Sequence, residues 1–178
     1  MSEVVYIADI KIECKSGPLR FAYLPAEKEP VSFGVHGAIA EHYGVSPESS
    51  EPHATTLDYV IAATGGWLTG TFGGALEARK ISASNKRLTS DVRGEVELED
   101  NVLVIKRINV LYHLKAPKAA LETIERVHEM HAKHCPVYRS LHKVIDITTD
   151  FQVEFSNWCF WLVERFRNNV AMGGVLEC

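Results

Sequence analysis

An uncharged, glycine-rich run of 18 residues, 59–76, constrains the fold of this chain more than any other feature. Its length just reaches the lower limit for a membrane-spanning helix. However, five of its residues are glycine and three are threonine, so its transfer into lipid would gain little free energy. Thr55 or Thr56 suits a helix N-cap, and Asp58 suits the first helical turn. We therefore expect a long helix that runs to about Arg79 within a folded domain, and no membrane span.

Small residues recur every four positions in this helix, at Ala62, Gly66, Gly70 and Gly74. Side chains four apart lie on the same helical face. Glycine inside a helix costs about 1 kcal/mol relative to alanine, so its repeated use indicates that another backbone packs closely against this face. The pattern predicts that the helix is the buried axis of the fold.

Charge and cysteine content exclude several classes of protein. The chain has 178 residues with 19 basic and 23 acidic side chains, so it lacks the positive excess typical of nucleic-acid-binding proteins. Its four cysteines form no CxxC pair, which favours reduced thiols in the cytoplasm. Glu3, Asp9 and Lys11 interrupt the stretch where a signal peptide would need an apolar core. We expect a cytoplasmic protein that binds no nucleic acid.

Hydrophobic periodicity predicts strand pairs on both sides of the central helix. The expected strands are 4–13, 19–24, 88–98, 102–114 and 144–155, and the expected further helices are one that follows Pro117, a short turn at 136–141 and a closing helix at 156–169. Residues 25–52 are expected to form a long loop with a short helix near 37–43. This order, with hairpins rather than βαβ repeats, predicts an α+β fold with antiparallel sheets.

Cys135 is the strongest single candidate for chemistry. Pro136 suits the first position of a helix, which places the thiol at a helix N-terminus, where the helix dipole favours the thiolate. His131, His134 and Arg139 lie near in sequence and add positive charge. A lone cysteine is more often buried and inert, and the sequence leaves both interpretations open.

Three histidines, His128, His131 and His134, precede this cysteine at a spacing of three residues. Together with a thiolate they offer the ligand types that zinc prefers. Helix side chains three and six residues apart seldom converge on one ion, and histidines at helix ends more often contact the last carbonyls. We therefore expect no metal here, although the pattern alone does not decide it.

Aromatic residues gather at the end of the chain, where six of the 16 lie between positions 151 and 166. They are Phe151, Phe155, Trp158, Phe160, Trp161 and Phe166. The sequence allows two interpretations, core packing of a closing helix or a surface that binds a partner.

Three segments share a pattern with one known family. Residues 56–66 (TLDYVIAATGG) match a central helix, residues 107–114 (RINVLYHL) match the strand before the second helix, and Cys135-Pro136-Val137 followed by Leu141 matches a second-cysteine motif. Together they resemble the OsmC/Ohr family of thiol-dependent hydroperoxide-handling proteins. The resemblance implies antiparallel sheets wrapped around two long central helices in an intertwined homodimer. It covers residues 1–155, and residues 156–178 would then form an aromatic helical extension packed on the same domain.

The chemistry implied by the resemblance uses two cysteines. The first, on the central helix, attacks the peroxide and becomes a sulfenic acid, and the second condenses with it to a disulfide. Cys135 matches the second, resolving position. Trp67 stands at the first position, and an indole can neither attack a peroxide bond nor form a disulfide. We therefore expect the two-cysteine cycle to be absent and no cofactor to be required.

The other residues implied by the resemblance match less closely. Asp58 lies about one position from the family's acidic residue and also suits stabilisation of the helix N-terminus. Arg20 is the only candidate for the family's early arginine, because no other arginine precedes Arg79. Trp67, Gly66 and Tyr138 are expected to line a pocket at the subunit interface.

Three functions follow from these observations. The first is an OsmC-like homodimer, related to proteins of hydroperoxide detoxification, that binds a small apolar molecule or hydroperoxide. The second is a one-cysteine, thiol-dependent peroxidase that uses Cys135. The third is a non-catalytic interaction protein that uses its aromatic C-terminal helix.

Overall fold

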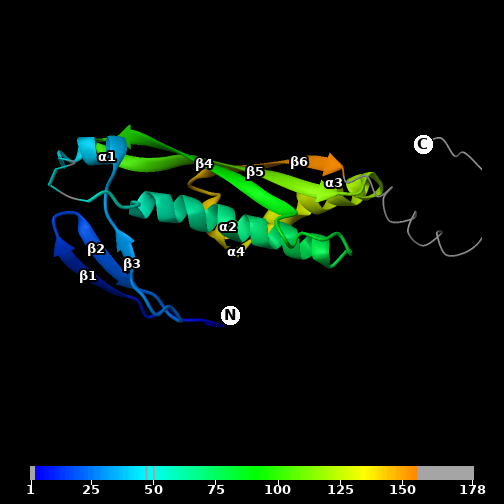
Figure 1. Ribbon diagram of the computed structural model, residues 1–178, viewed down its shortest axis with the longest axis horizontal. Coiled ribbons are helices and arrows are strands. Elements are labelled where there is room, and N and C mark those ends of the chain that lie inside the picture. The colour runs from blue at the N-terminus through cyan, green and yellow to red at the C-terminus, as the bar shows by residue number, and fades with distance from the viewer. Residues whose placement is uncertain (1–2, 47, 50, 156–178) are drawn as a thin grey trace, which may run out of the picture. The chain divides into compact units, whose positions relative to one another are not determined.

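The computed structural model describes residues 3–46, 48–49 and 51–155, and it has the mixed helix and strand content that the sequence predicts (Figure 1). The elements are β1 Lys11–Ser16, β2 Leu19–Tyr23, β3 Val31–Phe33, α1 Gly37–His42, α2 Thr56–Glu77, β4 Leu88–Glu99, β5 Val102–Ala116, the 3-10 turn η1 Lys118–Ala120, α3 Leu121–His131, the 3-10 turn η2 Ala132–His134, α4 Pro136–Leu141 and β6 Asp146–Phe155. The predicted closing helix and most of the aromatic tail lie outside the described residues.

The chain forms two compact units. The first comprises residues up to 64 together with 94–106, and the second comprises 65–93 together with the residues from 107 onward. The sheet β1-β2-β3 and α1 belong to the first unit, whereas α3, α4 and β6 belong to the second.

The sheet of the first unit is antiparallel throughout. Its β1–β2 hairpin turns at Gly17, whose φ of 52° is easily adopted by glycine. The third strand, β3, corrects the prediction of a loop over 25–52, and its three residues are too few to show a periodic pattern. The short helix near 37–43 is confirmed as α1.

The first predicted strand begins later than expected. β1 starts at Lys11, and residues 3–10 have no regular structure. Val4, Val5, Tyr6 and Ile7 expose between 72% and 94% of their surface. The alternation in this segment is therefore not used for pairing within the described part of the chain.

Helix α2 begins where the sequence predicts. The Thr55 N–H and hydroxyl both donate to Oδ2 of Asp58, at 2.7 Å each, and the Asp58 N–H donates back to the Thr55 Oγ1 at 3.1 Å. This reciprocal arrangement is a capping box. The buried face of the helix consists of Thr64, Leu68, Phe72 and Leu76, all 0% exposed.

The glycine stripe of α2 corrects one expectation. Among the described residues, a Cβ at Gly66, Gly70 or Gly74 would meet no atom within 4 Å, so that part of the chain leaves this face open and does not make it a buried axis. The helix instead packs closely against β4 at Gly65, where a Cβ would lie 2.3 Å from Cγ2 of Val92.

The sheet β4-β5-β6 corrects another expectation. β5 and β6 pair in parallel, from Arg107 opposite Asp146 to Ala116 opposite Phe155, whereas antiparallel pairing was expected. The reason is that α3 and α4 lie between the two strands and carry the chain back to the same end of the sheet. β4 and β5 are neighbours joined by Asp100 and Asn101, whose φ values of 49° and 65° suit a tight hairpin turn, as the sequence predicts.

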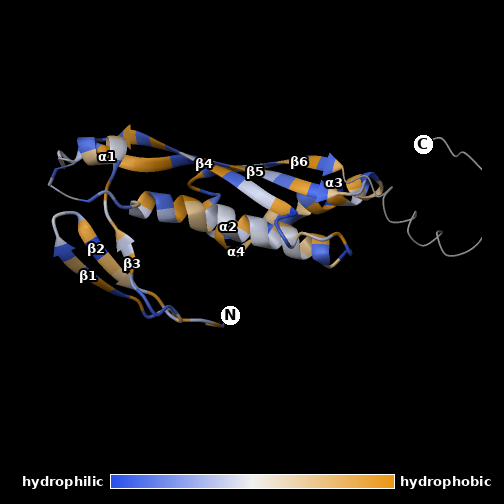
Figure 2. Cartoon of the chain, in the orientation of Figure 1, coloured by the Kyte–Doolittle hydropathy of each residue, from blue (hydrophilic) through white to orange (hydrophobic). Residues whose placement is uncertain are grey.

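The core of the second unit lies on one face of β5. Alternate residues of the strand are buried, and Figure 2 shows the corresponding alternation of hydrophobic and hydrophilic residues along β4 and β5. The buried set is Ile108, Val110, Tyr112, Leu114 and Ala116, and α3 contributes Ile124, Val127 and His131. No helix in residues 3–46, 48–49 and 51–155 is long and apolar enough to cross a bilayer.

Candidate functional site

Cys135 lies at the start of α4, as the sequence predicts. It is the N-cap residue, Pro136 follows it in the first turn, and its Sγ accepts a hydrogen bond from the Tyr138 N–H at 3.4 Å. The side chain is nevertheless fully buried, with 0% of its surface exposed. A peroxide therefore reaches this thiol only if the surrounding residues move.

A buried hydrogen-bonded chain, which the sequence does not reveal, lies near this cysteine. His131 Nδ1 lies 2.7 Å from the backbone carbonyl of His128, and its Nε2 lies 2.9 Å from the Tyr112 hydroxyl. Because a carbonyl can only accept, Nδ1 carries the proton, and the Tyr112 hydroxyl donates to Nε2. The Phe72 ring packs on both side chains, at 4.6 Å from Tyr112 and 5.0 Å from His131 between ring centroids.

Burial determines the ionisation of this chain. It lowers the pKa of His131 from 6.5 to about 4, although the hydrogen bond to the His128 carbonyl opposes the shift. Burial, and secondarily the charge of Cys135, raise the pKa of the Tyr112 phenol above its ordinary value. Both groups are therefore neutral near pH 7, and the chain holds a proton on Tyr112 without charge separation.

The three histidines before Cys135 lie in different environments. His131 is buried against Tyr112, the His128 Nε2 lies 3.1 Å from the Thr149 hydroxyl, and His134 is exposed. Within the described residues, no group of three metal-ligating side chains comes together. His128 and His131 lie side by side, with ring centroids 5.2 Å apart and both against Phe72, whereas His134 is exposed, so the spacing in sequence does not bring all three together.

Trp67 lies on the open face of α2. It exposes 54% of its surface, and it borders a shallow hollow of about 370 Å³ together with Gly66, Gly70 and Thr71. No thiol lines this hollow among the described residues. The position of Trp67 is therefore accessible, but its side chain offers an apolar ring and one N–H donor rather than a nucleophile.

Tyr138 does not line that hollow in the single chain. Its ring stacks on His142, with ring centroids 4.8 Å apart and planes at 9°. The expected pocket of Trp67, Gly66 and Tyr138 was placed at an interface between two chains, so it stays a prediction.

Asp58 stabilises the start of α2. Besides the two hydrogen bonds from Thr55, its Oδ2 lies 2.9 Å from Nε2 of His36. Partial burial would raise the pKa of this carboxyl, but the hydrogen bonds from Thr55 and His36 outweigh burial and lower it. These contacts stabilise the start of α2, and the catalytic role that the resemblance implies for Asp58 stays a prediction.

Arg20 lies on β2, opposite Phe33 of β3. It lines a cavity of about 360 Å³ in the first unit, together with residues of α1 and of the first turn of α2. The sequence singles out Arg20 only through the resemblance. Its position on a cavity wall depends on segments far apart in the chain.

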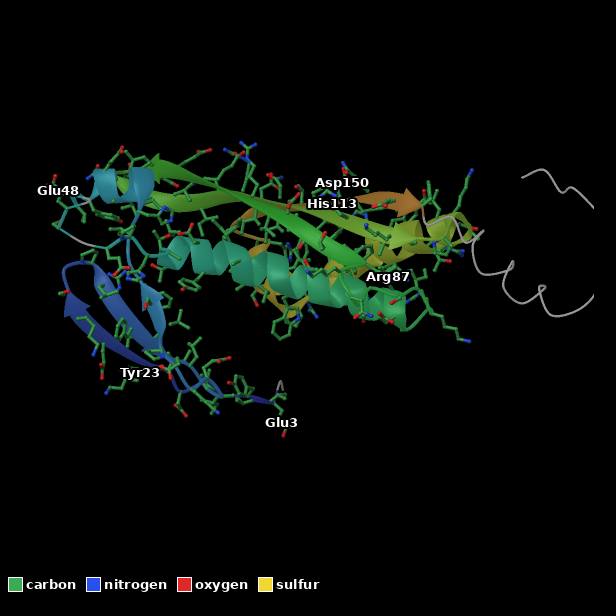
Figure 3. The ribbon with its side chains drawn as sticks, viewed as in Figure 1. Glu3, Tyr23, Glu48, Arg87, His113 and Asp150 are labelled. Atoms are coloured by element: carbon green, nitrogen blue, oxygen red, sulfur yellow. The ribbon has the colours of Figure 1, made fainter. Side chains whose placement is uncertain are left out.

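Polar side chains cover the exposed face of the second sheet, where Figure 3 labels His113 and Asp150. His113 Nε2 lies 2.8 Å from Oδ2 of Asp91, and the Asn109 side-chain amide donates to the Thr148 hydroxyl at 2.6 Å. Alternation with the buried face explains these residues as a solvated surface.

Comparison with known proteins identifies the class to which this fold belongs. The sequence profile of the OsmC-like protein family matches residues 49–150, more than half of the chain, and the chain therefore belongs to this family. No curated protein matches the sequence.

Solved structures show the same fold. An OsmC-like protein from Mycoplasma pneumoniae has 14% identity and a TM-score of 0.63, over 86% of this chain and 100% of that one. The organic hydroperoxide resistance protein OhrB of Bacillus subtilis has 12% identity and a TM-score of 0.55, over 84% and 100%. An organic hydroperoxide resistance protein OsmC, a predicted redox protein from Legionella pneumophila, has 12% identity and a TM-score of 0.59, over 85% and 100%.

Proposed function

We propose that this chain is an OsmC-like scaffold that lacks the two-cysteine peroxidase cycle and binds a small, largely apolar molecule at an interface between two copies. In this proposal residues 1–155 form the OsmC-like domain, and residues 156–178 form an aromatic extension packed on it. The protein acts in the cytoplasm, without nucleic acid, membrane or cofactor.

The observation that carries the proposal is the environment of Trp67. This ring stands at the position that the family resemblance assigns to the attacking cysteine, and it is half exposed beside two glycines without side chains. An exposed indole flanked by glycines provides a flat apolar wall for a ligand. It provides no group that can take an oxygen atom from a peroxide.

The open face of α2 supports assembly of two copies. The stripe of glycines permits close backbone approach, and it has no partner within the described part of the chain. A second α2 packed on this face would bury the stripe together with Trp67. The homodimer and its pocket are therefore parts of the same proposal.

Substitution of Gly70 by leucine is expected to convert the homodimer to a folded monomer. A Cβ at Gly70 would meet no atom of the described residues within 4 Å, so we expect the single-chain fold to tolerate a larger side chain there. Overpacking costs about 1–3 kcal/mol at each site, and the symmetric contact contains two such sites, so dimer affinity falls by at least about 30-fold. Sedimentation velocity over a concentration series measures the change.

The matched control adds a leucine elsewhere on the surface. Glu129→Leu places the same side chain on an exposed position of α3 and is expected to leave the dimer intact. A wild-type protein that stays monomeric at high concentration would contradict the proposed interface.

The activity test follows consumption of cumene hydroperoxide and hydrogen peroxide in the presence of dithiothreitol. We expect no turnover above background in the wild type or in Cys135→Ser. Mass spectrometry of the recovered protein shows whether any cysteine thiol has been oxidised.

Turnover that disappears in Cys135→Ser would instead establish a one-cysteine peroxidase. There the Cys135 thiolate would attack the peroxide, releasing the alcohol and leaving a sulfenic acid. The dithiol would then reduce the sulfenic acid to the thiol, with release of water and formation of a dithiothreitol disulfide. The Asp58 and Arg20 roles implied by the family would in that case be tested next.

A further inference from the structure

A cavity in the first unit is separate from every residue that the proposed function uses. Its volume of about 360 Å³ lies in the range of small-molecule sites. Its described lining comes from β2, the segment after β3, α1, the start of α2 and the start of β5. It contains neither Trp67 nor Cys135.

The walls of this cavity are mostly apolar. The apolar side chains that line it are Val35, Ile39, Tyr43, Val45, Leu57 and Leu103. They come from three stretches of the chain, residues 35–45, the start of α2 and the start of β5, so the cavity is formed by the tertiary fold of the unit. Such walls favour a hydrocarbon chain or ring, because burial of apolar surface is the main source of affinity there.

Arg20 is the charged residue among the described residues that line the cavity. Within residues 3–46, 48–49 and 51–155, its guanidinium has no ion pair or hydrogen bond to a side chain or carbonyl. The acidic residue of the first turn of α2, Asp58, is already engaged by Thr55 and His36. Arg20 is half-buried on the cavity wall, and its five N–H donors are available to an acceptor on a bound ligand.

We infer that this cavity binds a monocarboxylate with an apolar tail. The carboxylate pairs with the Arg20 guanidinium, whose planar fork matches two carboxylate oxygens, and the tail lies against the apolar walls. One guanidinium balances one negative charge, which favours a carboxylate over a doubly charged phosphate monoester. The inference does not depend on the proposed function, because the cavity needs neither a second chain nor a reactive thiol.

The experiment is isothermal titration calorimetry of the full chain with sodium octanoate and with octanol, its uncharged analogue. We expect the wild type to bind one octanoate per chain. Arg20→Gln removes the charge and retains a side chain of similar length, and it is expected to weaken octanoate binding by about 10-fold or more. Octanol binding is expected to be the same in both proteins.

Two further variants keep the test decisive. Arg126→Gln removes an exposed arginine of α3, paired with Glu122, and is expected to leave octanoate binding unchanged. Ile39→Phe narrows the cavity from its apolar wall and is expected to weaken octanoate and octanol alike. Absence of octanoate binding in the wild type, or equal affinity of the wild type and folded Arg20→Gln, would overturn the inference.

Discussion

Lowering the pH from 6.5 towards 4 is expected to reduce the free energy of unfolding by up to about 3 kcal/mol through His131 alone. The value follows from the shift of the His131 pKa from 6.5 to about 4, at about 1.36 kcal/mol per pKa unit. The folded state keeps this imidazole neutral in the core, whereas the unfolded chain protonates it with the ordinary pKa of 6.5. The unfolded state therefore binds more protons between these two values. The stabilisation is complete above pH 6.5 and is lost progressively as the pH falls towards 4.

Urea unfolding at a fixed protein concentration, from pH 7.5 to pH 4.5, measures this loss. His131→Gln removes the titrating group, and its amide oxygen can still accept from the Tyr112 hydroxyl. The variant is less stable at pH 7. Between pH 6.5 and pH 4.5, however, the slope of its free energy of unfolding against pH is expected to be smaller than that of the wild type, by the amount that corresponds to about one bound proton. His128, whose pKa burial also lowers, lies beside His131 with ring centroids 5.2 Å apart, and it contributes to both curves. Identical pH slopes for the two proteins would show that His131 is not held neutral.

The start of α2 could be predicted from sequence because its signals are local. Thr55 and Asp58 stand three residues apart and make their reciprocal hydrogen bonds whatever the rest of the chain does. His131 shares a helical face with Ile124 and Val127, and this local pattern explains its burial. The expectation that His131 adds positive charge beside Cys135 is wrong, because burial keeps it neutral. Hydrophobic periodicity and helix capping both depend on residues within about one helical turn, so a sequence pattern is enough to predict them.

Strand direction and site geometry could not be predicted in the same way. The alternation in β6 is the same whether it runs parallel or antiparallel to β5, and only the long helical connection between them carries information about direction. Two features of the site depend on packing between distant segments. They are the hydrogen bond from the Tyr112 hydroxyl to His131 and the cavity beside Arg20. The Pro136 signal placed Cys135 at a helix start but gave no information about its burial.

The glycine stripe shows how a correct pattern led to an incomplete interpretation. Glycines at four-residue spacing predict a face suited to close approach, but no described residue packs on it, and the sequence does not say which chain would approach. Within the single chain the approach occurs at Gly65, against Val92. The proposed homodimer assigns the open stripe to a second copy.

Replacement of Trp67 by cysteine is expected to create a redox-active pair with Cys135. If the family alignment is right, position 67 is the attacking position and Cys135 the resolving one. The new thiolate would attack cumene hydroperoxide, releasing cumyl alcohol and leaving a sulfenic acid. Condensation with the Cys135 thiol would then form a disulfide and release water. We expect close to one intrachain disulfide per chain after a single equivalent of peroxide.

The experiment uses a background in which Cys14, Cys159 and Cys178 are serine, so that only the pair under test can react. Free-thiol titration and mass spectrometry of unreduced peptides identify the bond. Thr71→Cys in the same background is the matched control, because it lies one helical turn further along α2, beside the same hollow. It is expected to keep both thiols free.

Formation of the disulfide depends on the positions of the backbone at residues 67 and 135, which we expect the Trp67→Cys substitution to leave unchanged. A disulfide forms only where two Cα atoms lie within about 7 Å with suitable Cβ directions. Trp67 and Cys135 both belong to the second unit, so their pairing requires no rearrangement between units. If the folded Trp67→Cys variant keeps two free thiols under peroxide, position 67 is not the attacking position. The reason for expecting a lost peroxidase would then disappear, while membership of the family would stand on the profile match alone.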